Sequence, residues 1–298
     1  MGYKIGSFNV MNFGYADKGS SNKNLEQLAN IIIGEQFDIV ALQEVLAEGK
    51  GIKRLLWYLG PSWQMKFCDA KSISADSRGE GYAFIWNSRK IQLVKAPNNP
   101  QTYDRYMGNL VRQPCYARFT PNNTVNGCFC EFRIICVHLY YGSSTGAKDI
   151  IKRQKEFEIV AKEIYPRIAD KRYGNNMPAY TILLGDYNLN LPGINKRPWL
   201  QNVFEITDAG RIKQIVTVQE QKTSLKRNVD NEAQDNNDND YGYANNFDHF
   251  TFDSNRFEGI GNNYQRIDAV KKYYKNDFET YKQEISDHIP ILMDIELK

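Results

Sequence analysis

Residues 181–190 read Thr-Ile-Leu-Leu-Gly-Asp-Tyr-Asn-Leu-Asn, an uncharged apolar run that becomes polar at Gly185. The apolar part predicts a buried strand. Residues two apart on an extended backbone face the same way, so the Asp186 carboxylate and the Asn188 amide are expected to point together from the end of this strand. The alternative is a strand that runs into an ordinary polar turn, because Gly, Asp and Asn all favour turns.

The same construction recurs along the chain, which favours the first interpretation. Polar side chains follow or precede predicted strands at Asn9, Glu44, His138, Asp186, Asn188, Asp248, Asp287 and His288. Carboxylate and amide oxygens are the ligands that Mg²⁺ prefers, and a bound Mg²⁺ polarises a phosphoryl oxygen. We therefore expect Glu44 and Asp287, with Asn9 and Asp186 nearby, to form a metal site.

Only three histidines occur in the chain. A single histidine after a strand is usually a hydrogen-bonded structural residue, but His138 and His288 both accompany carboxylates at strand ends, and this favours catalysis. His249 has the opposite strand parity to Asp248, so we expect it to be structural.

The alternation of strands with few long helices predicts large mixed sheets with helices outside. The chain of 298 residues, 42% of them hydrophobic, is expected to form a single domain, 1–298. The predicted strands are 3–10, 37–44, 82–86, 91–96, 115–119, 129–139, 181–184, 247–252, 264–270 and 289–295, and the predicted helices are 25–34, 148–168 and 199–204. The Asn- and Asp-rich segment 228–246 is expected to be a mobile loop.

The 38 basic and 35 acidic residues give a net charge of +3, which does not indicate a nucleic-acid coat protein but permits a locally basic surface. No apolar run approaches the length of a membrane span. Cys128, Cys130 and Cys136 share one strand parity and are expected to be small buried residues, with no disulfide framework. The N-terminus lacks a signal-like pattern, which favours a cytoplasmic protein over a secreted one whose signal has been removed.

Five short motifs carry a resemblance to a known family. They are Phe8-Asn9, Leu42-Gln43-Glu44-Val45, Gly185-Asp186-Tyr187-Asn188, Phe247-Asp248-His249-Phe250 and Ser286-Asp287-His288-Ile289-Pro290. In this order they resemble the motifs of the endonuclease/exonuclease/phosphatase superfamily, and they extend from residue 8 to residue 290. Each motif alone is weak, but the ordered set is specific.

Within that superfamily the chain is most similar to the deoxyribonuclease I branch. Glu80 precedes an aromatic strand as that branch's carboxylate does, and His138 stands where the branch has its first catalytic histidine. Arg112-Gln113-Pro114 resembles its phosphate-contact motif, although Gln113 replaces an acidic residue.

The resemblance implies an α/β four-layer sandwich, in which two packed mixed sheets are flanked by helices, with the site at one edge. It implies that Glu44 is the principal Mg²⁺ ligand, helped by Asn9 and Asp287, with Mn²⁺ or Ca²⁺ as alternative ions. It further implies the remaining roles: Asp186 and Asn188 orient water and phosphate or hold a second ion, Arg112 contacts phosphate, Glu80 orients His138, and Asp248 orients His288. One imidazole then accepts a proton from water while the other protonates the leaving oxygen.

The expected substrate is DNA, cleaved with little sequence preference by a monomer that does not bind membranes. Arg112, the Arg-, Tyr- and Asn-rich loop 97–114, and a loop with Lys71 and Arg78 suit contacts to phosphate, unless these loops are ordinary solvated surface. A phosphatase or phospholipase acting on inositol phosphates or sphingomyelin is the first alternative. A catalytically inactive binding module is the second.

Overall fold

The computed structural model describes most of the chain. The described residues are 2–14, 23–71, 79–122, 130–142, 146–173, 177–191, 203–208, 210–229, 240–258 and 260–297. Most of the predicted mobile loop, 230–239, lies outside these residues, as do Cys128 and Arg78. Sections 240–246 and 228–229 of that loop are described, and Tyr243 packs there in the core with 1% of its surface exposed.

Two mixed sheets form the centre of the protein. The strands of the first, in spatial order, are β13 (Gly261–Arg266), β14 (Ile291–Glu296), β1 (Gly2–Phe13), β2 (Ile39–Val45), β4 (Gly81–Asn87) and β3 (Trp63–Asp69). Those of the second are β10 (Val203–Asp208), β11 (Arg211–Val218), β12 (Asp248–Asp253), β9 (Ala179–Asp186), β8 (Glu131–His138), β7 (Cys115–Pro121) and β5 (Ile91–Leu93), with β6 (Gln101–Thr102) also pairing with β7.

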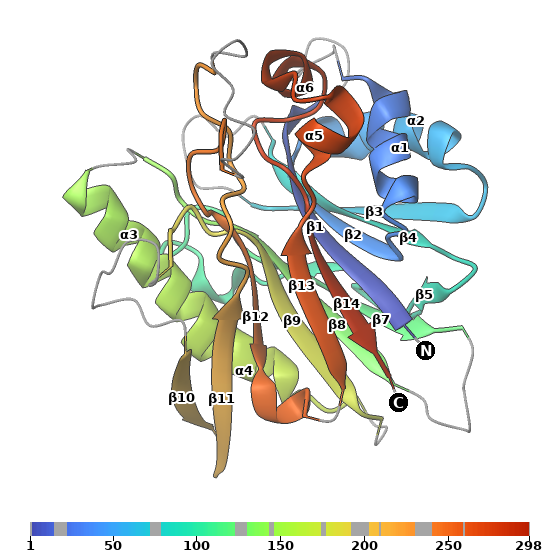
Figure 1. Ribbon diagram of the computed structural model, residues 1–298. Coiled ribbons are helices and arrows are strands. Elements are labelled where there is room, and N and C mark those ends of the chain that lie inside the picture. Colours follow the sequence, from blue (N-terminus) through green and yellow to red (C-terminus); the bar gives the residue numbers. More distant parts are fainter. Residues whose placement is uncertain are drawn as a thin grey trace.

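Helices cover the outer faces of both sheets (Figure 1). On the first sheet lie α1 (Leu25–Gly34), α2 (Lys50–Leu59), α5 (Ala269–Tyr274) and α6 (Phe278–Glu284), and on the second lie α3 (Ala147–Glu158) and α4 (Tyr165–Ala169), joined by a π-helical turn, Ile159–Ile164. Among the described residues, none of the helices has the length and apolar character needed to span a membrane.

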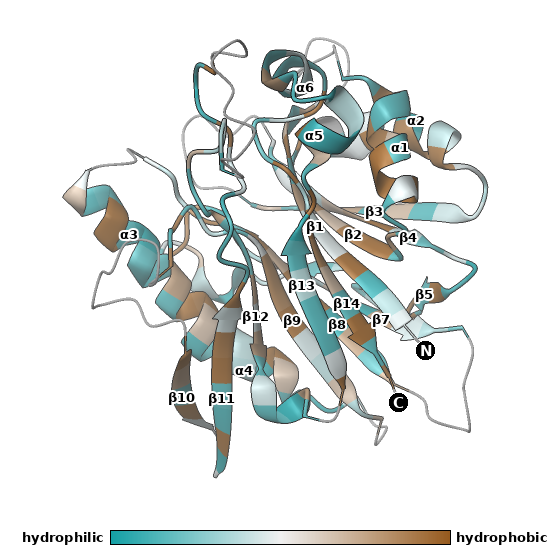
Figure 2. Cartoon of the chain, viewed as in Figure 1, coloured by the Kyte–Doolittle hydropathy of each residue, from teal (hydrophilic) through white to brown (hydrophobic). Residues whose placement is uncertain are grey.

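Three apolar clusters separate the four layers, and the strands that supply them are the brown central ones in Figure 2. The middle cluster lies between the sheets and includes Ile5, Phe84, Ile134 and Phe250, each with at most 1% of its surface exposed. Burial on both faces explains why these strands are continuous apolar runs. The architecture confirms the predicted four-layer α/β sandwich.

Two strand pairs are parallel, and they bring the ends of four strands to one edge. β1 runs parallel to β2, and β8 runs parallel to β9. Because the carboxyl ends of parallel strands meet at the same edge of a sheet, the residues that end these strands gather there. β12 is antiparallel to β9, so Asp248 at its start lies opposite Asp186 at the end of β9.

Some elements differ from the sequence prediction. Val203 and Phe204 begin strand β10 instead of ending a helix, because they pair with β11; the rest of the predicted helix 199–204 lies outside the described residues. The strand predicted over 264–270 ends at Arg266, and the Asp268 side chain caps α5 by accepting a hydrogen bond from the Lys271 N–H at 3.0 Å.

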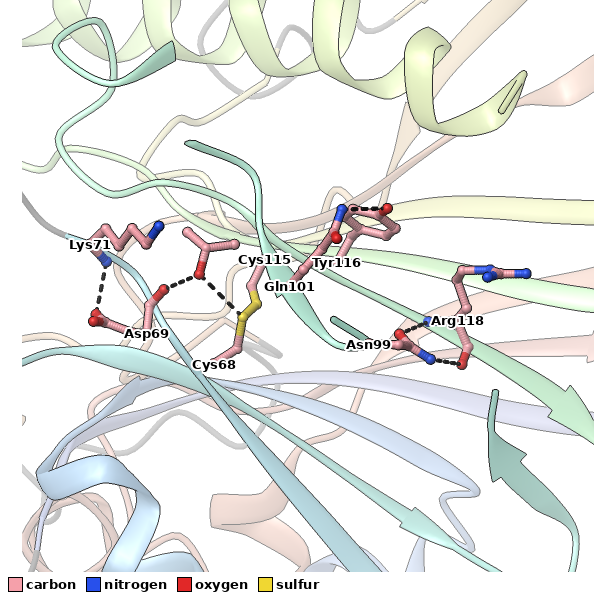
Figure 3. The surroundings of a disulfide bond; sticks show 9 residues. Cys68, Asp69, Lys71, Asn99, Gln101, Cys115, Tyr116 and Arg118 are labelled. Carbon is pink, nitrogen blue, oxygen red and sulfur yellow. Dashed lines mark hydrogen bonds between the residues drawn. A yellow bond between two sulfur atoms is a disulfide. The ribbon is translucent and has the colours of Figure 1, made fainter. Parts of the chain in front are cut away.

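A disulfide joins the two sheets, contrary to the expectation that the cysteines form no disulfide framework. Cys68 of β3 bonds to Cys115 of β7, although 47 residues separate them in the sequence (Figure 3). Cys130 and Cys136 are buried, as predicted. The pairing was not predictable because only the packing of one sheet on the other brings the two strands together.

Candidate active site

The strand register places three of the predicted polar residues side by side. His138 is aligned with Asp186 across β8 and β9, and Asp186 is aligned with Asp248 across β9 and β12. Asn9 lies on β1 of the other sheet, and its amide nitrogen donates to Asp186 Oδ2 at 3.0 Å. Both sheets therefore contribute to one cluster at the edge between them.

His138 forms the first carboxylate–imidazole pair with Glu80. Its Nδ1 lies 2.6 Å from Glu80 Oε1, and Arg112 donates from Nε to the other Glu80 oxygen at 2.7 Å. Burial raises the pKa of Glu80, but the charges of His138 and Arg112 and their hydrogen bonds outweigh burial and lower it to about 2. Burial and Arg112 lower the pKa of His138, but the carboxylates of Glu80 and Asp186 raise it above its usual value.

His288 forms the second pair with Asp248. Its Nδ1 lies 2.8 Å from Asp248 Oδ2, and its backbone N–H donates to Ser286 Oγ at 3.1 Å. Both partners are buried, with 7% of His288 and none of Asp248 exposed. Burial lowers the pKa of His288, but the charges of Asp248 and Asp186 outweigh it and raise the pKa well above its usual value. In each pair the carboxylate fixes the tautomer and orientation of the ring.

Asp186 lies between the two imidazoles. Its Oδ2 is 3.7 Å from Nε2 of His138 and also 3.7 Å from Nε2 of His288. The ring nitrogens that are not held by Glu80 or Asp248 therefore face a common point. Burial raises the pKa of Asp186, and the charge of Asp248 raises it further, against the opposing charge of His288.

The backbone departs from regular strand geometry near these side chains. The β1–β2 register shifts between Asn9 and Phe13, and Glu44 has a φ of 57°. Non-glycine residues with positive φ are uncommon and cluster at functional sites. Gly185 has a φ of 141°, and a Cβ there would lie 2.0 Å from the Val137 carbonyl oxygen, so only glycine allows β8 and β9 to approach so closely.

Asn188 reaches the site by a different route from the one predicted. β9 ends at Asp186 and Asn188 has a φ of 52°, so the argument from extended-strand parity does not apply to it. Instead, the Asn188 N–H donates to Asp186 Oδ1 at 2.8 Å, and its side-chain amide donates to the Leu139 carbonyl at 3.0 Å. The two residues are adjacent because of this turn.

The three predicted metal ligands are Glu44, Asn9 and Asp287, each of which has a side-chain oxygen. Asn9 donates to Glu44 Oε1 at 2.9 Å, and the Asn12 N–H donates to Glu44 Oε2 at 2.9 Å. Asp287 Oδ1 is buried and has no hydrogen-bond partner among the described residues. The buried Lys23 ammonium donates to the Ile285 carbonyl nearby; burial lowers the pKa of Lys23 to about 8, against the opposing charges of Asp287 and Glu44.

The donor atoms are hard oxygens, which suit a divalent cation. In the described part of the chain, however, no three or more His, Cys, Asp and Glu side chains are grouped so that they could hold a metal ion by themselves. Mg²⁺ keeps several waters and is usually held by one or two carboxylates, so a complete cage is not required. The unpartnered Asp287 Oδ1 and the Glu44 carboxylate, with 20% of its side chain exposed, supply oxygens of this kind.

Several residues around the site were not singled out from the sequence. Tyr82 accepts a hydrogen bond from the His138 N–H at 3.1 Å, and Ser286 donates to the Asn9 carbonyl at 2.7 Å. Arg153 and Glu156 of α3 are buried polar residues on the face of the helix that packs against the site. Charged residues on a buried helix face are unusual, but the helix pattern alone did not show which face was buried.

Other predictions had mixed outcomes. His249 is structural as expected: it is buried, and its Nε2 lies 2.9 Å from the Leu189 carbonyl oxygen. Loop 97–114 is more ordered than a free surface loop, because it contains β6 and a short 3₁₀ turn, Asp104–Tyr106. Arg112 binds Glu80 as described above, so its predicted contact with phosphate stays a prediction.

The Glu80→Gln variant should lose a pH-dependent part of the stability. A carboxyl whose folded pKa lies below its unfolded pKa contributes stability above the unfolded value of 4.5, and this is lost as the pH falls through the folded value of about 2. The lowering of the Glu80 pKa from 4.5 to about 2 corresponds to roughly 3 kcal/mol in the free energy of unfolding. Urea denaturation between pH 5 and pH 2 should therefore show the free energies of unfolding of wild type and Glu80→Gln converging.

Glu258→Gln, which removes an exposed carboxyl, is the matched control. Histidines are protonated in both the folded and the unfolded state over this pH range, so they add little to the difference. If the free energies of unfolding of wild type and Glu80→Gln differ by the same amount from pH 5 to pH 2, Glu80 is not the ionised partner of His138.

The fold resembles those of several solved structures, whereas no family model and no curated protein sequence matches the chain. An endonuclease/exonuclease/phosphatase family protein from Bacteroides thetaiotaomicron is 14% identical with a TM-score of 0.54, and covers 99% of this chain and 95% of its own. A mannosyl-6-phosphatase from the same organism is 13% identical (TM-score 0.54; 99% and 100%). D. rerio TDP2, in complex with a single-strand DNA product, is 14% identical (TM-score 0.56; 99% of both chains).

Proposed function

We propose that this chain, which has the fold of endonuclease/exonuclease/phosphatase family proteins, is a divalent-metal-dependent phosphodiesterase that cleaves DNA with little sequence specificity. One observation carries the proposal: the Nε2 atoms of two carboxylate-paired imidazoles both lie 3.7 Å from the same oxygen, Oδ2 of the buried Asp186. Hydrolysis of a phosphodiester needs one group that accepts a proton from water and one that protonates the leaving oxygen.

Glu44, Asp287 and the Asn9 side chain are proposed to hold the ion. A bound divalent cation would polarise the phosphoryl oxygen and offset the charge that grows in the transition state. Mg²⁺ is the proposed ion because the donors are hard oxygens, with Mn²⁺ and Ca²⁺ as alternatives.

The protein groups are proposed to divide the proton transfers between them. Attack of a water oxygen on phosphorus forms one P–O bond while the bond to the leaving oxygen breaks. Of the two imidazoles, one takes the proton from the water and the other gives its proton to the leaving oxygen. Asp186 and the Asn188 N–H, joined at 2.8 Å, position the water and the phosphate between the rings. Arg112 keeps Glu80 ionised and oriented toward His138.

DNA is the proposed substrate because cationic side chains come from segments next to this edge of the sheets. Arg112 pairs with Glu80, Lys71 pairs with Asp104 at 2.8 Å with 42% of its side chain exposed, and Arg105 is exposed in the 3₁₀ turn. Side chains of this kind hold phosphates without reading bases. The structural likeness to TDP2, whose structure contains a single-strand DNA product, supports the same substrate class.

A phosphomonoesterase is the second candidate function. The similarity in fold to a mannosyl-6-phosphatase supports it, because that protein acts on a sugar phosphate. A phosphomonoesterase would use the same imidazoles and carboxylates as the phosphodiesterase. Only the residues that bind the rest of the substrate would differ between the two functions.

The test is nicking of supercoiled plasmid with Mg²⁺ by the wild-type protein. Conversion of supercoiled to open-circular DNA that stops in excess EDTA supports the proposal. Parallel reactions with mannose 6-phosphate, an inositol phosphate and sphingomyelin test the alternatives. Release of phosphate or phosphocholine from one of these, with plasmid left intact under every divalent ion, would show that the DNA assignment is wrong.

We propose that the protein is monomeric and acts in an oxidising compartment. The sequence favoured the cytoplasm, but the Cys68–Cys115 disulfide is of the kind that persists in secreted proteins, and it supports the secreted alternative. The reduced protein should unfold at a lower temperature than the oxidised protein. Equal unfolding temperatures would argue against a structural disulfide.

A further inference from the structure

An exposed aromatic residue lies at the rim of the site and has no part in the mechanism above. Tyr141 follows His138 by three residues, and 43% of its surface is exposed. Its ring contacts the Phe247 ring edge-on, with 6.3 Å between centroids. Phe247 directly precedes Asp248, so Tyr141 bridges the segments that carry the two carboxylate–imidazole pairs.

The main chain beneath Tyr141 is held by a buried carboxylate. Glu156 of α3 has 1% of its surface exposed, and its Oε2 accepts a hydrogen bond from the Tyr140 N–H at 2.8 Å. Its Oε1 accepts one from the Val111 N–H, also at 2.8 Å. The carboxylate thus ties the segment after His138 to the segment that carries Arg112.

A buried guanidinium supports the ring itself. Arg153, one turn before Glu156 on α3, lies 5.7 Å from the centroid of the Tyr141 ring. It also donates to the Asn188 carbonyl at 2.7 Å, which links the ring to the turn beside Asp186. Tyr141 is therefore exposed but held in place. Its side chain loses little conformational freedom when a ligand packs on it, so the entropic cost of binding is small.

The chemistry around Tyr141 suits a planar base on a charged chain. The Lys152 ammonium lies 3.8 Å from the centroid of the neighbouring Tyr140 ring, and Asp149 accepts a hydrogen bond from the Tyr140 hydroxyl at 3.2 Å, so a cation and an anion accompany the aromatic rings at this rim. An acyl chain would require a wider apolar surface, whereas a nucleotide offers a flat π face and a phosphate. Base–aromatic stacking is sequence-tolerant, because every base has such a face.

We propose that Tyr141 is a stacking platform for a nucleobase next to the scissile phosphate, preorganised by Glu156 and Arg153. This rests on the proposed phosphodiesterase function and narrows its substrate class to nucleotides whose bases are unstacked, as in single strands. Stacking on one aromatic side chain changes binding by about 5- to 150-fold.

The test compares two oligothymidylates that have one cleavable linkage and all others blocked. One carries every base, and the other lacks the bases on either side of that linkage. Wild type should show a kcat/KM about 10- to 100-fold higher on the base-bearing oligonucleotide. Tyr141→Ala should bring the ratio close to one while retaining the rate on the base-free oligonucleotide, and Tyr141→Phe should preserve the ratio.

Tyr58→Ala is the matched control. Tyr58 is similarly exposed, at 52%, but lies on α2, on the opposite side of the molecule from α3 (Figure 1). This variant should keep the wild-type ratio. A Tyr141→Ala variant that keeps the ratio, or that slows both oligonucleotides equally, would overturn the platform.

Failure of the proposed function gives a different result. If wild type cleaves neither oligonucleotide and also leaves supercoiled plasmid intact, the phosphodiesterase assignment fails, and the platform is tested by fluorescence anisotropy of the same oligonucleotides in EDTA. Cleavage of plasmid but of neither oligonucleotide would overturn the platform and keep the phosphodiesterase assignment. Tighter binding of the base-bearing oligonucleotide that disappears in Tyr141→Ala would support the platform. Equal binding of both oligonucleotides by wild type would overturn it.

Discussion

His138→Ala and His288→Ala should each reduce the kcat for phosphodiester hydrolysis by about 10²- to 10⁴-fold, the usual contribution of a positioned acid or base. Each substitution removes a group that transfers a proton and leaves a carboxylate, the partly buried Glu80 or the buried Asp248, without its imidazole. The measurement is the initial rate of cleavage of bis-(p-nitrophenyl) phosphate at saturating Mg²⁺.

A double substitution checks that each pair acts as a unit. Removing two members of one unit costs little more than removing the more important member. We therefore expect Asp248→Asn combined with His288→Ala to be about as slow as His288→Ala alone. Circular dichroism and thermal unfolding check that the variants remain folded. A folded His288→Ala variant with wild-type kcat would exclude His288 from the chemistry.

Glu44→Gln is expected to have the second large effect, on the dependence of activity on the metal. Asn9 and Asn12 donate to different oxygens of Glu44, so glutamine can accept only one of these two hydrogen bonds, and it removes the negative charge that attracts the cation. Residues that only support a metal ligand already change affinity by about 10- to 100-fold, so loss of a ligand's charge should weaken half-saturation by Mg²⁺ by at least about 100-fold. Titration of activity with Mg²⁺, together with calorimetric titration of the protein alone, measures this shift.

Glu48→Gln provides the matched control for this experiment. Glu48 follows Glu44 by four residues but is exposed, so its replacement by glutamine should leave the Mg²⁺ titration unchanged. Wild-type Mg²⁺ dependence in Glu44→Gln would place the ion elsewhere, whereas activity in excess EDTA would rule out the metal requirement.

The pattern of strand ends was predictable because it depends on local chemistry. Buried strands are apolar, so the acidic Glu44 and Asp186, and the polar His138, are conspicuous where each run stops. The order of the motifs then indicated the fold, which the structure confirms. The roles of these residues in catalysis stay predictions.

The partners of several residues were not predictable from local sequence. Arg112 pairs with Glu80, 32 residues away, which the local sequence did not indicate, and its contact with phosphate stays a prediction. Asn188 was expected to follow strand parity, but a left-handed turn positions it. In both cases long-range contacts outweigh the local pattern, because a buried charge or amide needs a hydrogen-bond partner.

The sequence by itself determined the kind of elements in this protein and the identity of its polar strand ends, because apolar periodicity and turn residues act over a few neighbouring positions. The tertiary structure alone decided which strand ends meet, which cysteines pair, and that Glu156 and Arg153 support the rim at Tyr141. These contacts join residues far apart in the chain, and they form only when two sheets pack face to face and a helix closes over one of them.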